Sequence, residues 1–229
     1  MRCSQVLSAL TVILLVHLNV VSATALTIHI PADSPSITEG LSIAVSGDTL
    51  LVAPGIYLEH DLLIPSGVSL LGATGDPVDV VINAQQQGRV AACIDLAELV
   101  RLEALTLTGG LATMETVDWP KGGGLLIDAS PAEIRHCRLI DNEAEVEGGG
   151  IACNNGSDAW IVDCVVMGNR SIDGPGVSCQ GSSPILENCI IAGNDGLVWG
   201  GALFCNNGSN PRVVGCTMVG NDAHFGAGI

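Results

Sequence analysis

The feature that most constrains this chain is a glycine-rich mark that returns at one constant interval through its C-terminal half. The copies are GGGL at Gly122, GGGI at Gly148, GPGV at Gly174, GGAL at Gly200 and GAGI at Gly226. An equal spacing of this size is typical of a solenoid, in which each turn buries its apolar side chains against the neighbouring turns. Any function of such a rod must lie on its outer surface.

Aligning the turns on their glycines places cysteines in two columns. The first column holds Ile127, Cys153, Cys179 and Cys205, and the second holds Cys137, Cys164, Cys189 and Cys216. The adjacent columns contain Ile, Leu, Val and Met, so we expect all of them to point into the core. Side chains stacked on parallel strands keep their Cβ atoms about 4.8 Å apart, which is farther than a disulfide prefers. The sequence therefore predicts mostly free, buried thiols that act as small hydrophobes.

A third column is made of asparagines. It follows the second cysteine column at a fixed distance along the chain and holds Asn142, Asn169, Asn194 and Asn221. Asparagine tolerates the left-handed backbone conformation, and its amide can bond to the same amide on the next turn. We predict an asparagine ladder at one corner of the coil, with these residues in the left-handed conformation.

The fold class that these columns predict is all-β, a parallel β-helix. Its strands are short, rich in Ile, Val and Cys, and separated by Gly, Asn, Ser and Pro. Upstream, an N-cap signal and an early proline precede an apolar stripe, which predicts a capping helix over 34–46 that covers the open apolar end. Leu105 precedes Cys137 by more than one regular repeat, so we expect a lateral loop over 111–121, carrying Met114, Glu115, Asp118 and Trp119.

The segment 1–25 has the layout of a secretory signal peptide, with Arg2, an apolar run over 12–16 and small residues over 21–25. The mature domain would then span 26–229, with regular turns over 122–229 and no membrane span after cleavage. The chain has 8 basic and 24 acidic residues, a net charge of -16, which argues against nucleic acid as a partner. We expect a secreted or cell-surface protein.

Three segments carry a resemblance to a known group of proteins: GDTLLVAPGIYLEH from Gly47, GGGIACNNGS from Gly148 and PILENCIIAGN from Pro184. From about Thr27 to Ile229 the chain resembles the secreted bacterial right-handed parallel β-helix repeat proteins of the pectin-lyase-like superfamily. The resemblance implies a right-handed coil. That superfamily includes lyases, polygalacturonases and adhesins, so the fold does not settle the activity.

One cluster could serve a polysaccharide lyase. His136 and Asp163 each precede a cysteine of the second column, so they should lie on adjacent turns, next to Arg135 and Arg138. A histidine oriented by a carboxylate could act as a general base. The alternative interpretation is a surface charge pair of little consequence.

Two other sets of residues could bind ligands. Trp119, Trp160, Trp199 and Phe225 could stack against sugar rings, with Trp199 and Phe225 stacked on adjacent turns, although corner packing would explain them as well. Asp141, Glu143, Glu145 and Glu147 could supply oxygen ligands for calcium, the one cofactor we consider, or form a solvated turn. No cofactor is required by the sequence.

The leading hypothesis is a non-catalytic, secreted or surface β-helix module whose repetitive face binds a polysaccharide, a cell-surface glycan or another protein. The alternative is a polysaccharide lyase or related carbohydrate-active enzyme. The last copy of the mark stands at the end of the sequence, so we expect a truncated C-terminal end, covered by further sequence or by another protein.

Overall fold

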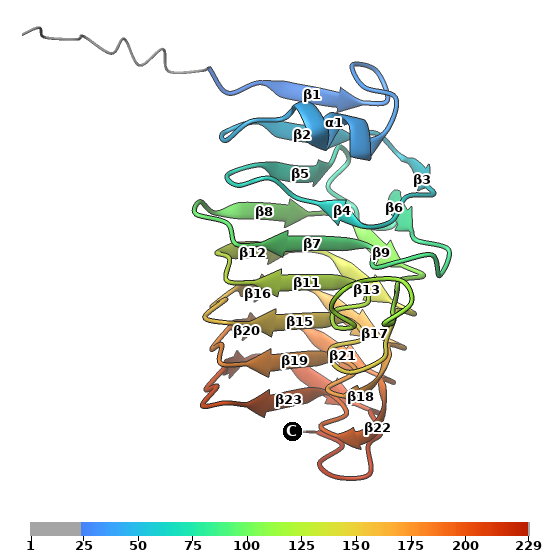
Figure 1. Cartoon of the computed structure of the whole chain (residues 1–229), viewed down its shortest axis with the longest axis vertical. Coiled ribbons are helices and arrows are strands. Elements are labelled where there is room, and N and C mark those ends of the chain that lie inside the picture. Colours follow the sequence, from blue (N-terminus) through green and yellow to red (C-terminus); the bar gives the residue numbers. More distant parts are fainter. Residues whose placement is uncertain (1–23, 229) are drawn as a thin grey trace, which may run out of the picture.

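The computed structural model describes residues 24–228, which form a coil of stacked parallel strands (Figure 1). The predicted signal peptide lies outside the described residues except for Thr24 and Ala25. The strands form four sheets, here called A to D, and in the later turns the chain passes through them in the order A, B, D and C. The predicted parallel β-helix is confirmed.

Sheets A and B run along almost the whole coil. Sheet A contains β1 (Thr27–Ile30), β2 (Thr49–Val52), β5 (Ser69–Gly72), β8 (Val100–Glu103), β12 (Ala132–Arg135), β16 (Trp160–Val162), β20 (Ile185–Glu187) and β24 (Arg212–Val214). Sheet B contains β3 (Gly55–Tyr57), β6 (Val80–Asn83), β9 (Thr106–Thr108), β13 (Arg138–Ile140), β17 (Val165–Met167), β21 (Ile190–Ala192) and β25 (Thr217–Val219).

Sheets C and D complete the cross-section. Sheet C, which faces the viewer in Figure 1, contains β4 (Leu62–Leu63), β7 (Ala91–Ile94), β11 (Leu125–Asp128), β15 (Ile151–Asn154), β19 (Val177–Gln180) and β23 (Leu203–Asn206). Sheet D is shorter and contains β10 (Leu111–Ala112), β14 (Glu143–Ala144), β18 (Arg170–Asp173) and β22 (Asp195–Trp199). Sheet D therefore begins one turn before the regular turns, in the turn that carries the lateral loop.

The cysteine columns point inward, as predicted. Cys153 pairs in register with Ile127 and Cys179, and Cys179 with Cys205. All eight cysteines from Cys93 to Cys216 are free, and six of them are buried. Burial raises the pKa of Cys93, Cys137 and Cys153 to about 12. These thiols are neutral core residues.

The asparagine ladder is confirmed by an unbroken chain of amide hydrogen bonds. Nδ2 of Asn142 donates to Oδ1 of Asn169 (3.2 Å), Asn169 to Asn194 (3.0 Å), and Asn194 to Asn221 (2.8 Å). The predicted left-handed conformation of these asparagines is wrong. It falls one residue earlier, on Asp141, Gly168, Gly193 and Gly220, because the corner turns before the amide enters the core.

The glycine mark serves two steric needs. Gly148 has φ +65, a conformation that costs residues with a Cβ atom. A Cβ on Gly149 would lie 2.4 Å from the carbonyl oxygen of Arg170 on the next turn. The first glycine therefore turns the chain, and the second allows two turns to approach closely.

The capping helix is shorter than predicted. It is α1 (Ile37–Ile43), and its N-cap is Ser36, whose side chain accepts from the amide of Glu39. Ala44 is extended and ends the helix, so the predicted bounds of 34 and 46 are wrong at both ends. Ile37 and Leu41 are buried in the main core cluster, so the helix packs against the coil near its N-terminal end. Among the described residues, no helix is long and apolar enough to cross a membrane.

Candidate functional site

The predicted lateral loop follows β10, and a buried arginine holds it against the coil. Arg89 Nε donates to the carbonyl oxygens of Lys121 and Gly122, both at 3.0 Å. Its Nη2 donates to the carbonyl of Lys121 at 2.8 Å and to that of Trp119. Burial lowers the pKa of Arg89 to about 10, which still leaves it charged at neutral pH. Arg89 thus fixes the loop backbone at Trp119, a residue that is itself 64% exposed.

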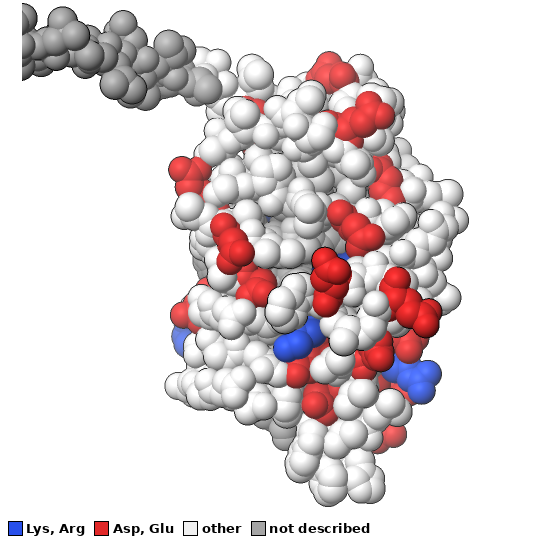
Figure 2. All heavy atoms as spheres, in the orientation of Figure 1, with Lys and Arg blue, Asp and Glu red and all other residues white. Residues whose placement is uncertain are grey.

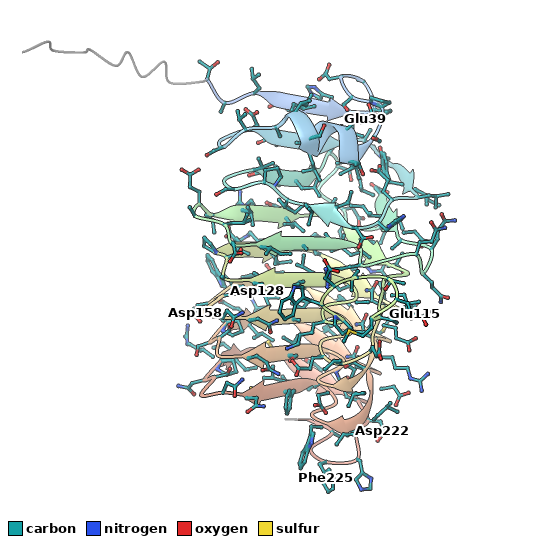
Figure 3. The ribbon with its side chains drawn as sticks, viewed as in Figure 1. Glu39, Glu115, Asp128, Asp158, Asp222 and Phe225 are labelled. Atoms are coloured by element: carbon teal, nitrogen blue, oxygen red, sulfur yellow. The ribbon has the colours of Figure 1, made fainter. Side chains whose placement is uncertain are left out.

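Beside this loop, sheet C carries a row of polar side chains on its outer face. Asp128, Asn154, Gln180 and Asn206 are paired in register on four successive strands. Each follows a residue of the inward column, and successive side chains of a strand point to opposite faces. Figure 3 labels Asp128 on this face. The loop and the row enclose a cleft of about 350 Å³, lined by Asp95, Trp119, Lys121, Asp128, Asn154, Asn155, Gln180, Gly181 and Asn207.

A buried carboxylate supports the wall of the cleft. Glu147 is only 6% exposed, and its Oε2 lies 3.3 Å from Nζ of Lys121 and 3.4 Å from Oγ of Ser178. Its Oε1 accepts a hydrogen bond from Nε2 of Gln180. The ion pair neutralises Lys121, the only basic residue that lines the cleft among the described residues.

Some side-chain amide N–H groups of the cleft donate hydrogen bonds to other residues of its wall. Asn155 Nδ2 donates to Asp128 Oδ1 at 2.6 Å, and Asn207 Nδ2 donates to Gln180 Oε1 at 2.9 Å. Asn154 is different. It is 6% exposed, and its Oδ1 is the one buried side-chain nitrogen or oxygen without a hydrogen-bond partner in residues 24–228. A buried acceptor without a donor costs about 1–3 kcal/mol, so the fold places Asn154 at the wall of the cleft at an energetic cost.

The candidate lyase residues lie elsewhere, at the edge between sheets A and B. Arg135 ends β12, where its Nη1 lies 2.7 Å from Oε1 of Glu133 and its guanidinium lies 5.0 Å from the ring centroid of Trp160. The hydrogen bond to Glu133 raises the pKa of Arg135. Arg138 begins β13, where it pairs in register with Thr106 and Val165. Both arginines are therefore accounted for by strand positions and, for Arg135, by an ion pair.

His136 and Asp163 stand in one column, as predicted, but the column has a backbone explanation. Ala104, His136, Asp163 and Asn188 all have φ between 47 and 56, and Gly215 follows with φ 65. Each turn from β8 to β24 has the left-handed conformation at this corner, which Asn, Asp, His and Gly adopt most readily. Within residues 24–228, no side-chain hydrogen bond or salt bridge joins His136 to Asp163. The structure thus shows a corner, not an assembled base and its orienting group.

The four candidate calcium ligands do not converge. Asp141 occupies a left-handed corner, Glu145 accepts from the amide of Met114 at 2.8 Å, and Glu147 pairs with Lys121. Glu143 lies beside Arg170 in the register of sheet D. No group of three or more His, Cys, Asp or Glu residues in the described part of the chain could hold a metal ion.

The four aromatic candidates occupy three places. Trp119 borders the cleft, and Trp160 lies on β16 under Arg135. The predicted stack of Trp199 on Phe225 is confirmed, with ring centroids 4.5 Å apart and an interplanar angle of 26°. This pair borders a separate apolar hollow of about 230 Å³. The four rings therefore do not form one continuous ledge.

Sequence reasoning missed most of the cleft. Asp95, Asp128, Asn154, Gln180 and Asn207 were not singled out, although the column after the first cysteines is polar in four successive turns. That column was the available signal. The sequence carried no such signal for Arg89. Its role depends on hydrogen bonds to the carbonyl oxygens of Trp119 and Lys121, which lie about thirty residues further along the chain.

Comparison with known proteins agrees with this architecture. A family model described as "Right handed beta helix region" matches residues 102–229. No curated protein matches the chain. A solved structure of the pectin methylesterase from Aspergillus niger, in deglycosylated form, is similar over 87% of this chain and 87% of its own, with 12% identity and a TM-score of 0.44. Because the family model matches more than half of its residues, the chain belongs to the right-handed β-helix family.

Proposed function

We propose that this chain is a glycan-binding β-helix module and that the cleft beside Trp119 is its binding site. The observation that carries the proposal is a polar cleft in which the carboxylate acceptors of Asp95 and Asp128 line the same wall space as an exposed indole. Sugars offer hydroxyl donors for such acceptors and apolar ring faces for an indole. Few other ligands combine both properties along an extended chain.

The shape of the site supports an extended ligand. Apart from Lys121, the polar residues that line the cleft lie on or directly after β7, β11, β15, β19 and β23. Strands of one sheet are about 4.8 Å apart, so this row is about 19 Å long. An oligosaccharide lying parallel to the coil axis would meet a new polar side chain at each turn.

The proposal is tested by titrating the protein with neutral, acidic and amino oligosaccharides in a calorimeter. Trp119→Ala should weaken the binding of the best ligand by about tenfold or more, a loss of about 1.4 kcal/mol. Trp160→Ala is the matched control, because it removes the same ring from sheet A and should leave the affinity unchanged. Binding that survives Trp119→Ala but fails in Trp160→Ala would contradict this site.

The enzymatic alternative has its own test. Incubation with a panel of uronate polysaccharides and calcium should give no unsaturated products that absorb in the ultraviolet. Products that appear with the wild-type chain and disappear in His136→Ala would replace the binding proposal with a lyase.

A further inference from the structure

Resting on the proposed glycan site, we infer that the cleft selects a cationic glycan, namely an oligosaccharide of amino sugars with free amino groups. Three observations carry this inference: the charge of the cleft, the direction of its hydrogen bonds and the indole at its border.

The charge of the cleft is negative. Asp95 and Asp128 both line it, whereas Lys121 is paired with the buried Glu147. Figure 2 shows this face with many acidic and few basic side chains, in a chain of net charge -16. Anionic polysaccharides such as polyuronates would be repelled by this surface, and a cation would be attracted to it.

Three of the four amide side chains that line the cleft use an N–H group within its wall. Asn155 and Asn207 direct amide N–H groups at Asp128 and Gln180 within the wall, and Gln180 donates to Glu147. The carboxylates of Asp95 and Asp128 remain to accept hydrogen bonds from a ligand. A protonated amine carries three N–H donors and no acceptor, which is the complement of such a surface.

The indole of Trp119 completes the set. A cation over the face of a tryptophan ring is attracted by the ring quadrupole, and tryptophan is the best of the aromatic residues in this role. The residue is exposed, and Arg89 holds the backbone that carries it. An amino sugar can place its ring on the indole and its ammonium group among the acceptors.

A matched ligand series tests the inference. Tetramers of β-1,4-linked glucosamine, N-acetylglucosamine and glucose share one backbone and carry an ammonium, an amide or a hydroxyl group at carbon 2. We expect the glucosamine tetramer to bind at least about tenfold more tightly than the other two, and raised salt should reduce that preference. A galacturonate tetramer should bind most weakly.

Variants separate charge from shape. Asp95→Asn and Asp128→Asn should each lower the affinity for the glucosamine tetramer by about threefold to tenfold and leave the glucose tetramer unaffected. Asp163→Asn is the matched control, because it removes one carboxylate from a left-handed corner outside the cleft. Unchanged thermal midpoints would show that the variants fold.

Other outcomes overturn the inference in distinguishable ways. Equal affinity for the glucose and glucosamine tetramers, both dependent on Trp119, would overturn the charge preference and leave the glycan site standing. Binding of spermine or polylysine as tight as that of the glucosamine tetramer would show a general cation site and overturn the choice of a glycan. No Trp119-dependent binding by any oligosaccharide would overturn the proposed function together with the inference.

Discussion

The N-terminal and C-terminal turns of this coil share sheets A, B and C but are closed in different ways. In sheet A, Thr49 pairs with Ser69 and Ser69 with Arg101, so the second of these turns takes a much longer path than the first. In the later turns, Ile134 pairs with Ile161 and Ile161 with Leu186, and the two paths are nearly equal. The strands of sheet A keep their register in both regions, so the variation in length lies in the segments between them.

The regular turns repeat the same corner devices, whereas each early turn has its own. The asparagine ladder and the glycine mark recur in the later turns. In the early part, Glu59 accepts from the amides of Ile37 and Thr38 at the start of α1, and Asp48 accepts from those of Leu26 and Val45. Repetition is one way to satisfy the polar groups of a buried corner, and single long-range contacts are another. The cleft begins at the last early turn, with Asp95, and extends along the regular turns as far as Asn207.

We expect the largest difference in stability between the two regions when a glycine of each is replaced by alanine. Gly149→Ala places a Cβ 2.4 Å from a backbone oxygen of the next turn, and should cost about 3 kcal/mol of unfolding free energy. Gly75→Ala, in an early turn, meets no atom within 4 Å and should cost only the strain of its φ of +79, about 1 kcal/mol. Urea denaturation of both variants measures the difference, and equal costs would contradict the close-approach explanation.

Replacing an asparagine should also cost more stability in a regular turn than in an early turn, although the difference should be smaller than for glycine. Asn169→Ala removes the acceptor of the Asn142 amide and the donor to the carbonyl of Leu139, and should cost about 2 kcal/mol. Asn83→Ala, in an early turn, removes one local bond to the amide of Gln85 and should cost less than about 1 kcal/mol. If both variants lowered the denaturation midpoint equally, the ladder would contribute no more stability than a single local hydrogen bond.

Arg89 connects the early turns to the loop that borders the cleft. Arg89→Met should free the loop carbonyls, speed tryptic cleavage after Lys121 and weaken Trp119-dependent binding by about tenfold, or about 1.4 kcal/mol. The control Arg170→Met removes an exposed arginine that lies 3.7 Å from Asp195. Unchanged cleavage and binding in Arg89→Met would show that the loop holds its position without this anchor.

A substitution at Asn154 should change stability and glycan binding in opposite directions. Asn154→Leu replaces an unpartnered buried acceptor with an apolar side chain of similar size, so the free energy of unfolding should rise by about 1 kcal/mol. Glycan binding should fall in the same variant. A loss of stability would indicate that Asn154 supports the fold instead of a ligand.

The smallest effect concerns pH at the N-terminal end. The amides of Val45 and, to a lesser extent, Leu26 lower the pKa of Asp48 by hydrogen bonding to its carboxylate. A lowered folded-state pKa stabilises the fold above the ordinary pKa of Asp, and this contribution is lost as pH falls through the folded value. The difference in thermal midpoint between wild type and Asp48→Asn should shrink from neutral pH to pH about 2. A constant difference would show that the charge is not involved.

The inward columns could be predicted because each follows from spacing alone. Cys153, Cys179 and Cys205 must stack if the period is constant and the sheet is in register. The corner column containing His136 and Asp163 was predicted in position, with a general base and a surface charge pair as its two interpretations. Its residue types suit the left-handed backbone conformation of this corner, which is recognised only when the φ angles of several turns are compared.

The sequence by itself determined the coil, its period, its free thiols and its asparagine ladder, because these depend on short-range spacing repeated from turn to turn. Only the tertiary structure decided where Trp119 lies, which carbonyls Arg89 binds and that Asn154 is left without a partner. These features arise where a non-repeating loop meets a repeating sheet. Contacts of that kind depend on how one loop folds back, which no period can specify.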